Sequence, residues 1–289
     1  MIRMRTDFFS ESLGMGTSMV VLMPQAASGI GMEGADEPSR GGDHGATVGN
    51  AAGGAADGGA VSGGAADGSS ASAPGVPVLY LLHGLSDDCT IWERRTSIER
   101  YATGKGIAVV MPEVRRSFYS DEAVGERYWT FVAEELPELV ARTFRISTAR
   151  EDTFVAGLSM GGFGAFKLAL NHPERFAAAA SLSGALDPAS LGLEHNTGHL
   201  AERVWGGRDL AGTADDLLGR FATADPLSLP ALFLDCGTED ALLEQNRRFI
   251  ETAETASVDL TSRLRPGDHS WEFWDQGIQD VLDWLPLRG

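Results

Sequence analysis

Short apolar runs alternate with helix-like segments along most of this chain, and this alternation constrains its fold more than any other feature. Strand-like runs occupy residues 78–82, 107–111, 152–156, 177–182, 231–235 and 258–264. Helix-like segments occupy 97–104, 129–143, 160–171 and a C-terminal stretch that holds Ile278, Val281, Leu282 and Trp284. The pattern predicts the α/β class, with a mostly parallel central sheet and helices on both faces.

The N-terminal residues add an antiparallel element to this sheet. Residues 2–24 have the pattern of a hairpin that turns at 13–16, where Gly14 and Gly16 lie. With 43% hydrophobic residues among 289, the chain can bury one sizeable core. We therefore expect a single α/β domain over residues 1–289.

Residues 28–75 do not fit the globular pattern. They consist mainly of Gly, Ala, Ser and Asp, and the run Gly-Gly-Ala-Ala-Asp-Gly at 53–58 recurs at 63–68. Such a segment buries too little apolar surface to offset an ordering cost of roughly 1–2 kcal/mol per residue. It is predicted to be a disordered insertion; a glycine-rich phosphate loop is disfavoured because no Gly-Lys-Ser/Thr motif is present. Because the insertion directly precedes the predicted strand 78–82, we expect it to lie at the amino end of the parallel strands.

Charge and hydropathy exclude several classes of function. The chain has 23 basic and 41 acidic residues, a formal charge of −18, which disfavours nucleic-acid binding. No apolar run approaches the roughly 18 residues of a membrane helix, and the basic start lacks the apolar stretch of a signal peptide. Cys89 and Cys236 form no disulfide framework and are expected to be inert. These features predict a cytoplasmic protein without a membrane partner and leave open whether it forms a homo-oligomer.

The first chemically informative motif is Gly-Leu-Ser-Met-Gly at 157–161. A predicted strand ends at Ala156 and a predicted helix follows, so Ser159 occupies a sharp turn at which flanking glycines relieve crowding. A serine at such a turn projects its hydroxyl above the sheet edge, where it can act as a nucleophile. A plain strand-to-helix turn is the alternative interpretation.

A serine nucleophile needs a base and an acid, and chain order selects the candidates. In folds with this serine turn, the acid follows the serine and the histidine follows the acid. Only His269 comes after a plausible acid; the other histidines are His44, His83, His172, His195 and His199. Asp240 is the favoured acid and Glu239 its main competitor, whereas Asp235 is still within a strand and would lie too deep. Asp240 could also cap a helix over 241–250.

Two backbone amides are expected to hold the oxyanion of the reaction intermediate. One is that of Met160, directly after the nucleophile, and the other is that of Leu85, which follows the predicted strand 78–82 and the pair His83-Gly84. His83 is then a packing and hydrogen-bonding residue, not a base.

Several motifs together resemble one family. They are Leu-Leu-His-Gly-Leu at 81–85, Arg-Ser-Phe-Tyr at 116–119, Glu-Leu-Pro-Glu-Leu at 135–139, the run 157–165, and Gly-Thr-Glu-Asp at 237–240. In this order they resemble the esterase D-like family of α/β-hydrolases, most similar to bacterial tributyrin esterases and related to S-formylglutathione hydrolases. The resemblance covers the chain except 28–75. It implies an α/β-hydrolase fold, hydrolysis of short-chain or small aromatic carboxylic esters, and the same five residues: Ser159, Asp240, His269, Leu85 and Met160.

The substrate pocket is less well marked. The segment 187–225 is longer than an ordinary connection between a strand and a helix, and it is expected to form a small cap. The pocket candidates are Trp205 within this segment, Trp92 near the loop 83–86 (the oxyanion loop), and Trp271 near the base, although each could equally pack in the core. His195 and His199 have metal-like spacing, but Asn-Thr-Gly at 196–198 disfavours the helix this requires. We therefore expect neither a metal nor a cofactor.

The combined expectation is a serine carboxylesterase that acts on acetyl to butyryl or small aromatic esters, with a small-molecule ester as its partner. An S-formylglutathione-type thioesterase and an acyltransferase on the same fold are the alternatives, because both would use the same residues. A non-catalytic binding protein would not need all three groups.

Overall fold

The computed structural model describes residues 1–25, 75–190 and 199–288. Their strands join in one eight-stranded sheet in the order β1-β2-β4-β3-β5-β6-β7-β8. The strands are β1 (Ile2–Ser10), β2 (Met15–Met23), β3 (Val78–Leu82), β4 (Ala108–Pro112), β5 (Thr153–Leu158), β6 (Ala178–Leu182), β7 (Ala231–Gly237) and β8 (Leu260–Arg265). From β4 to β8 all neighbours are parallel, whereas β1, β2 and β4 pair antiparallel. The predicted α/β class and the N-terminal hairpin are confirmed. The hairpin turns at 11–14, two residues before the predicted turn, because Gly14 has a left-handed backbone and Met15 already pairs with Ser10.

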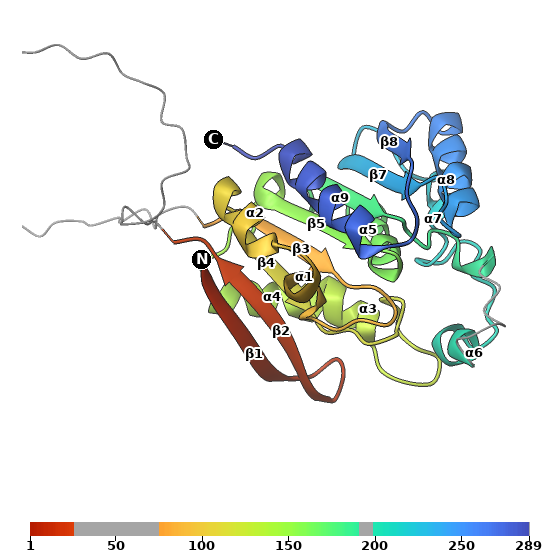
Figure 1. The fold of residues 1–289 in the computed structure, drawn as a ribbon. Coiled ribbons are helices and arrows are strands. Elements are labelled where there is room, and N and C mark those ends of the chain that lie inside the picture. Colours follow the sequence, from red (N-terminus) through yellow and green to blue (C-terminus); the bar gives the residue numbers. More distant parts are fainter. Residues whose placement is uncertain (26–74, 191–198, 289) are drawn as a thin grey trace, which may run out of the picture. The chain divides into compact units, whose positions relative to one another are not determined.

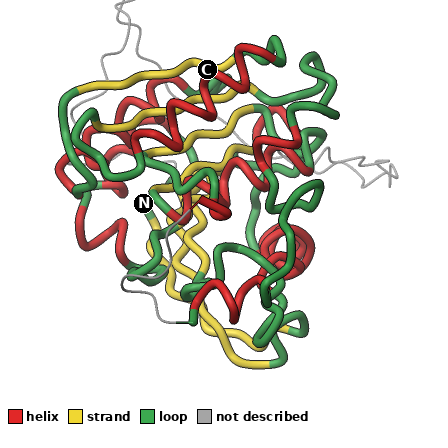
Figure 2. The backbone as a smooth tube through the Cα atoms, turned by 90° about the vertical axis from the view of Figure 1, so that its right-hand side faces the viewer, coloured by secondary structure: helices red, strands yellow, loops and turns green. Residues whose placement is uncertain are grey.

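Helices cover both faces of this sheet (Figures 1 and 2). The helices are α1 (Ile91–Arg95), α2 (Ile98–Lys105), α3 (Tyr128–Thr130), η1 (Phe131–Glu135), α4 (Leu136–Thr143), η2 (Arg150–Asp152), α5 (Met160–Asn171), η3 (Pro188–Ser190), α6 (Leu200–Trp205), α7 (Leu217–Arg220), α8 (Leu243–Thr255) and α9 (Trp271–Trp284). Apolar side chains of α1, α2 and α9 form one core with alternate strand residues such as Leu79 and Leu81. Those of α3 to α8 form the other core, with Val78, Tyr80 and Leu82. Alternate residues of β3 thus serve opposite cores, as expected for a sheet buried on both faces.

The predicted helix over 129–143 is broken into three parts for a local reason. Residues 131–135 form a π-helical turn between α3 and α4. Pro137 has no backbone N–H to donate to the carbonyl oxygen of Ala133. The Arg175 guanidinium donates to that carbonyl instead. The irregular turn therefore accommodates a proline whose effect the apolar spacing alone did not predict.

Two predicted regions lie wholly or partly outside the described residues. Of the predicted insertion 28–75, the structure describes Gly75 alone, and of the predicted cap 187–225 it describes 187–190 and 199–225, which hold η3, α6 and α7. Among the helices of the described ranges, none combines the length and the apolar character needed to cross a membrane.

Candidate active site

Ser159 lies at the turn between β5 and α5, at the carboxyl edge of the parallel strands. Its backbone has φ +52° and ψ −117°, a conformation that is strained for any residue with a side chain. Only glycine fits at the two flanking positions. A Cβ on Gly157 would collide with the Gly161 carbonyl group, and a Cβ on Gly161 would collide with the Leu82 carbonyl group. The tight turn leaves the Ser159 side chain half-buried rather than enclosed.

Three loops bring Ser159, His269 and Asp240 into one chain of hydrogen bonds. The His269 Nε2 atom lies 3.1 Å from Ser159 Oγ, and its Nδ1 atom lies 2.8 Å from Asp240 Oδ2. His269 comes from the loop between β8 and α9, and Asp240 from the loop after β7. About a third of the His269 side chain is exposed, whereas the Asp240 carboxylate is fully buried. The imidazole therefore links a buried acid to a hydroxyl at the surface.

The surroundings of Asp240 favour its charged form. Burial opposes ionisation, but hydrogen bonding and charge attraction from His269, together with the Leu242 amide, outweigh it and hold the pKa of Asp240 below its ordinary value. The Leu242 N–H donates to Asp240 Oδ1 at 2.8 Å. The predicted helix over 241–250 in fact begins at Leu243, so Asp240 accepts from the turn before the helix and does not cap it.

Glu239, the competing acid, has a different position. Its carboxylate accepts hydrogen bonds from the Gly267 amide and from Thr238, and the Gly267 bond is the main reason that its pKa lies below the ordinary value. Because Gly267 precedes His269 by two residues, Glu239 fastens the loop that carries the imidazole. The structure brings Asp240, not Glu239, into contact with His269.

The two predicted oxyanion donors, the amides of Leu85 and Met160, lie in the loop after β3 and at the start of α5. Met160 is the first residue of α5, and the first amides of a helix have no acceptor within it. Leu85 is the first central residue of a turn closed by the Asp87 amide on the Gly84 carbonyl, so its own N–H is not used by that bond. Leu82 pairs with Gly157 in the sheet, which brings the loop after β3 next to the loop after β5. Both amides are thus available to an oxygen atom above the serine.

His83 lies at the centre of the loop after β3. It is buried, its Nδ1 atom contacts the Gly84 carbonyl oxygen at 2.8 Å, and its Nε2 atom accepts from the Val114 amide at 3.2 Å. With both ring nitrogens bonded to backbone groups, His83 braces two adjacent loops.

The tryptophan candidates separate into two groups. Trp92 is buried, donates from Nε1 to the Leu82 carbonyl at 3.1 Å and packs edge-on against Trp271, with 5.4 Å between ring centroids. Trp271 in turn meets Trp274 at 5.2 Å, and Trp274 meets the His269 ring at 4.7 Å. A row of indoles thus joins the oxyanion loop to the imidazole. Trp205 lies apart from this row, buried against Phe118 at 5.0 Å. The pocket role of all three candidates stays a prediction.

Sequence reasoning missed three residues near the site: Trp274, Arg263 and Arg265. Trp274 follows Trp271 by three positions, the helical spacing that could have indicated a shared face. Asp235, expected to lie too deep for catalysis, is fully buried and paired with Arg263 and Arg265. Arg265 also donates to the Phe273 carbonyl at 3.0 Å. Arg265 of β8 therefore connects Asp235 of β7 to the start of α9, and these contacts hold both ends of the loop that carries His269.

The remaining candidates show no metal-binding arrangement in the part of the chain that the structure describes. His195 lies outside the described residues, and the His199 side chain is 94% exposed, next to Glu202. No cluster of three His, Cys, Asp or Glu side chains suited to a metal ion occurs within the described ranges. Both cysteines are buried, and burial raises the pKa of Cys236 to about 12, which disfavours the reactive thiolate.

Comparison with known proteins identifies the family. A family model named Esterase, with the description "Putative esterase", matches residues 68–285. The chain belongs to this esterase family. The expected resemblance is thereby confirmed: the protein is an esterase D-like α/β-hydrolase, and it is a serine-dependent ester hydrolase.

Individual relatives and structures agree with this membership. This esterase is similar to the acetyl esterase of Caldicellulosiruptor saccharolyticus, at 29% identity over 220 residues that cover 72% of this chain and 82% of the relative. It is 33% identical to the diacylglycerol acyltransferase/mycolyltransferase Ag85B of Mycolicibacterium smegmatis over 262 residues, 73% of this chain and 77% of the relative. Among solved structures, FphF, a fluorophosphonate-binding serine hydrolase of Staphylococcus aureus, matches with a TM-score of 0.78 and 29% identity over 98% of each chain. The S-formylglutathione hydrolase FrmB of the same species matches with a TM-score of 0.76 and 28% identity, also over 98% of each chain.

Proposed function

We propose that this esterase hydrolyses short-chain carboxylic esters, acetyl to butyryl, and small aromatic esters through an acyl-enzyme on Ser159. The observation that carries the proposal is the hydrogen-bonded chain from Ser159 Oγ through His269 to the buried carboxylate of Asp240. A hydroxyl at the accessible end of such a chain can lose its proton to the imidazole as it attacks an ester carbonyl.

Each step uses groups described above. His269 Nε2 takes the Ser159 proton while Oγ bonds to the ester carbon, and the Leu85 and Met160 amides donate to the resulting oxyanion. The protonated imidazole then gives its proton to the leaving alcohol. Water repeats the sequence on the acyl-enzyme and releases the acid. Asp240, buried and ionised, stabilises the imidazolium that forms in each half. The row of indoles supports the proposal that Trp271, which is half-buried, lines the substrate pocket, with the buried Trp92 packed behind it.

The proposed nucleophile is tested by Ser159→Ala together with a panel of p-nitrophenyl esters. We expect Ser159→Ala to lower kcat by roughly 10⁵–10⁶-fold with the thermal midpoint preserved, because the substitution removes only a half-buried hydroxyl and leaves the backbone of the turn unchanged. The wild-type enzyme should act best on acetyl to butyryl chains. Full hydrolysis by the alanine variant would overturn the mechanism, and a maximum at long acyl chains would overturn the substrate assignment.

Two alternatives are kept because specific relatives favour them. The acyltransferase Ag85B is 33% identical, and an acyl-enzyme can be resolved by an alcohol as well as by water. The solved structure of an S-formylglutathione hydrolase supports a thioester substrate. Product analysis with an added alcohol acceptor separates the first from hydrolysis, and a comparison of S-formylglutathione with p-nitrophenyl acetate separates the second. We also propose that 187–225 forms a small cap and that the enzyme is cytoplasmic.

A further inference from the structure

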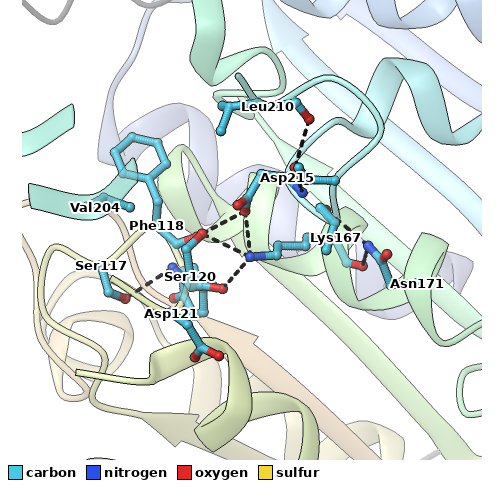
Figure 3. Close-up of polar contacts among 12 residues, drawn as sticks. Ser117, Phe118, Ser120, Asp121, Lys167, Asn171, Val204, Leu210 and Asp215 are labelled. Carbon is cyan, nitrogen blue, oxygen red and sulfur yellow. Dashed lines mark hydrogen bonds and ion pairs between the residues drawn. The ribbon is translucent and has the colours of Figure 1, made fainter. Parts of the chain in front are cut away.

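Lys167 is a buried charge that the proposed mechanism does not use. It is the one charged side chain of α5, the helix that begins directly after Ser159, and it is 1% exposed. Its ammonium group donates to Asp215 Oδ1 at 2.6 Å, to Ser120 Oγ at 2.9 Å and to the Tyr119 carbonyl oxygen at 2.8 Å. Figure 3 shows the Lys167 side chain reaching Ser120 and Asp215. All three N–H groups are satisfied, so the cation is held at one defined point.

The residues that Lys167 holds have an unfavourable backbone. Phe118 and Tyr119 both have left-handed φ values, +52° and +50°, although neither is glycine. The loop keeps this shape because the Tyr119 amide donates to Ser117 Oγ while its carbonyl accepts from Lys167. The Tyr119 ring lies directly on α5, where a Cβ on Gly164 would overlap it. Loop and nucleophile helix are therefore fixed to each other.

The other end of Tyr119 reaches the oxyanion loop. Its hydroxyl donates to the His83 carbonyl oxygen at 3.0 Å, two residues before Leu85. Tyr119 is fully buried, so this bond is not exchanged with water. A continuous set of contacts thus runs from Lys167 on α5 through Tyr119 to the peptide that precedes Gly84 and Leu85.

We propose that Lys167 and Tyr119 are positioning residues for the oxyanion hole. Lys167 holds the strained loop, and the Tyr119 hydroxyl holds the backbone that presents the Leu85 amide. The donors at Leu85 and Met160 then keep a fixed separation, because the same helix begins at Met160 and carries Lys167. This inference rests on the proposed function, since it assumes that those two amides bind the oxyanion.

Tyr119→Phe is the sharpest test, because it removes only the hydroxyl and leaves the ring packed on Gly164. We expect kcat for p-nitrophenyl butyrate to fall about tenfold, less than the ~10²–10³-fold typical for loss of a whole donor, with KM within about twofold. The inhibition constant of a trifluoromethyl ketone, whose serine adduct carries an oxyanion, should rise by the same factor as kcat falls. A residue that mattered only for stability would not link these two quantities.

Lys167→Met, which keeps the length of the side chain, should lower kcat at least as much as Tyr119→Phe does. The double variant, Tyr119→Phe with Lys167→Met, should lose no more kcat than Lys167→Met alone. Lys105→Met is the matched control, because Lys105 is the other lysine and pairs with Asp283 at the surface. Unchanged kcat in Tyr119→Phe, or losses that multiply in the double variant, would overturn the inference. If Lys167→Met does not fold, Tyr119→Phe alone decides. Activity that survives Ser159→Ala would instead overturn the proposed function, which keeps the two failures distinct.

Discussion

Two adjacent acidic residues, Asp240 and Glu239, divide the task of holding the imidazole. The buried Asp240 carboxylate is hydrogen-bonded to His269 Nδ1. The exposed Glu239 carboxylate instead accepts from the Gly267 amide and holds the loop that carries His269. An ionised Asp240 keeps the proton on Nδ1, so that Nε2 is free to accept from Ser159. The two carboxylates therefore differ in what they do although they are neighbours in sequence.

Substitution of each carboxylate by its amide tests this division. We expect Asp240→Asn to lower kcat by roughly 10³–10⁴-fold, because an amide can donate to the imidazole and favours the wrong tautomer. Glu239→Gln keeps an acceptor for Gly267, so its kcat should stay within about threefold of the wild-type value. Steady-state kinetics on p-nitrophenyl acetate measures both variants, and a larger loss in Glu239→Gln than in Asp240→Asn would reverse the assignment.

Local motifs indicated the residues that we propose to react, whereas they did not indicate the residues that hold them. Ser159 is identified by glycines at fixed offsets, and His269 by its place after the last strand, so both follow from nearby sequence. Lys167 and Trp274 could not be predicted in this way. Lys167 stands in an apolar helix, and its partners come from residues 119–120 and 215, which only the tertiary structure brings together.

At the scale of elements, the N-terminal hairpin is fastened by a side chain from the π-helical turn. Glu135, the last residue of η1, accepts from Ser10 Oγ at 2.7 Å and from the Glu11 and Ser12 amides at 2.9 Å. Burial disfavours its charge, but these donors outweigh it and hold the pKa of Glu135 below its ordinary 4.5. The spacing of strands along the sequence does not reveal such a contact, because the contact joins residues more than 120 positions apart.

This contact makes hairpin stability depend on pH. A carboxylate whose pKa is lowered by folding stabilises the protein fully above its unfolded value of 4.5 and ceases to do so as the pH falls through the lower folded value. We expect Glu135→Gln to cost about 1 kcal/mol at pH 7 and less at pH 4 and below. Urea unfolding at both pH values measures this, with the exposed neighbour Glu134 substituted by Gln as control. Equal losses at the two pH values would contradict the prediction.

At the scale of the whole molecule, the register of the sheet brings together the points where the chain leaves β2 and enters β3. Leu22 of β2 and Leu79 of β3 both pair with Val109 of β4, from opposite sides. Because β4 lies between β2 and β3, Leu22 and Leu79 are two strand spacings apart, about 10 Å. Both points lie at the amino end of the parallel strands, whereas Ser159, Asp240 and His269 follow the carboxyl ends.

The segment between these points should therefore be dispensable for the reaction. We expect replacement of residues 27–74 by about six Gly/Ser residues, which reach roughly 20 Å, to leave kcat/KM within about twofold. Ester hydrolysis and the thermal midpoint, compared with the full chain, measure the effect. A loss of activity above tenfold with the fold intact would show that the segment takes part in catalysis, contrary to the sequence-based expectation.

The order of strands was less predictable than their positions. Alternating apolar runs located each strand to within about two residues, but no local pattern places β4 between β2 and β3. That arrangement depends on antiparallel pairing of β2 with β4, a contact between residues about 90 positions apart in sequence.

Because β2 and β3 flank the same strand, we expect the length of polypeptide at this junction to have no effect on turnover. Additions or losses there should then alter neither the path of the six parallel strands nor the loops at their far ends. Natural selection on the reaction would then leave the junction free to drift, so homologous enzymes that differ widely in size here can share one reaction centre.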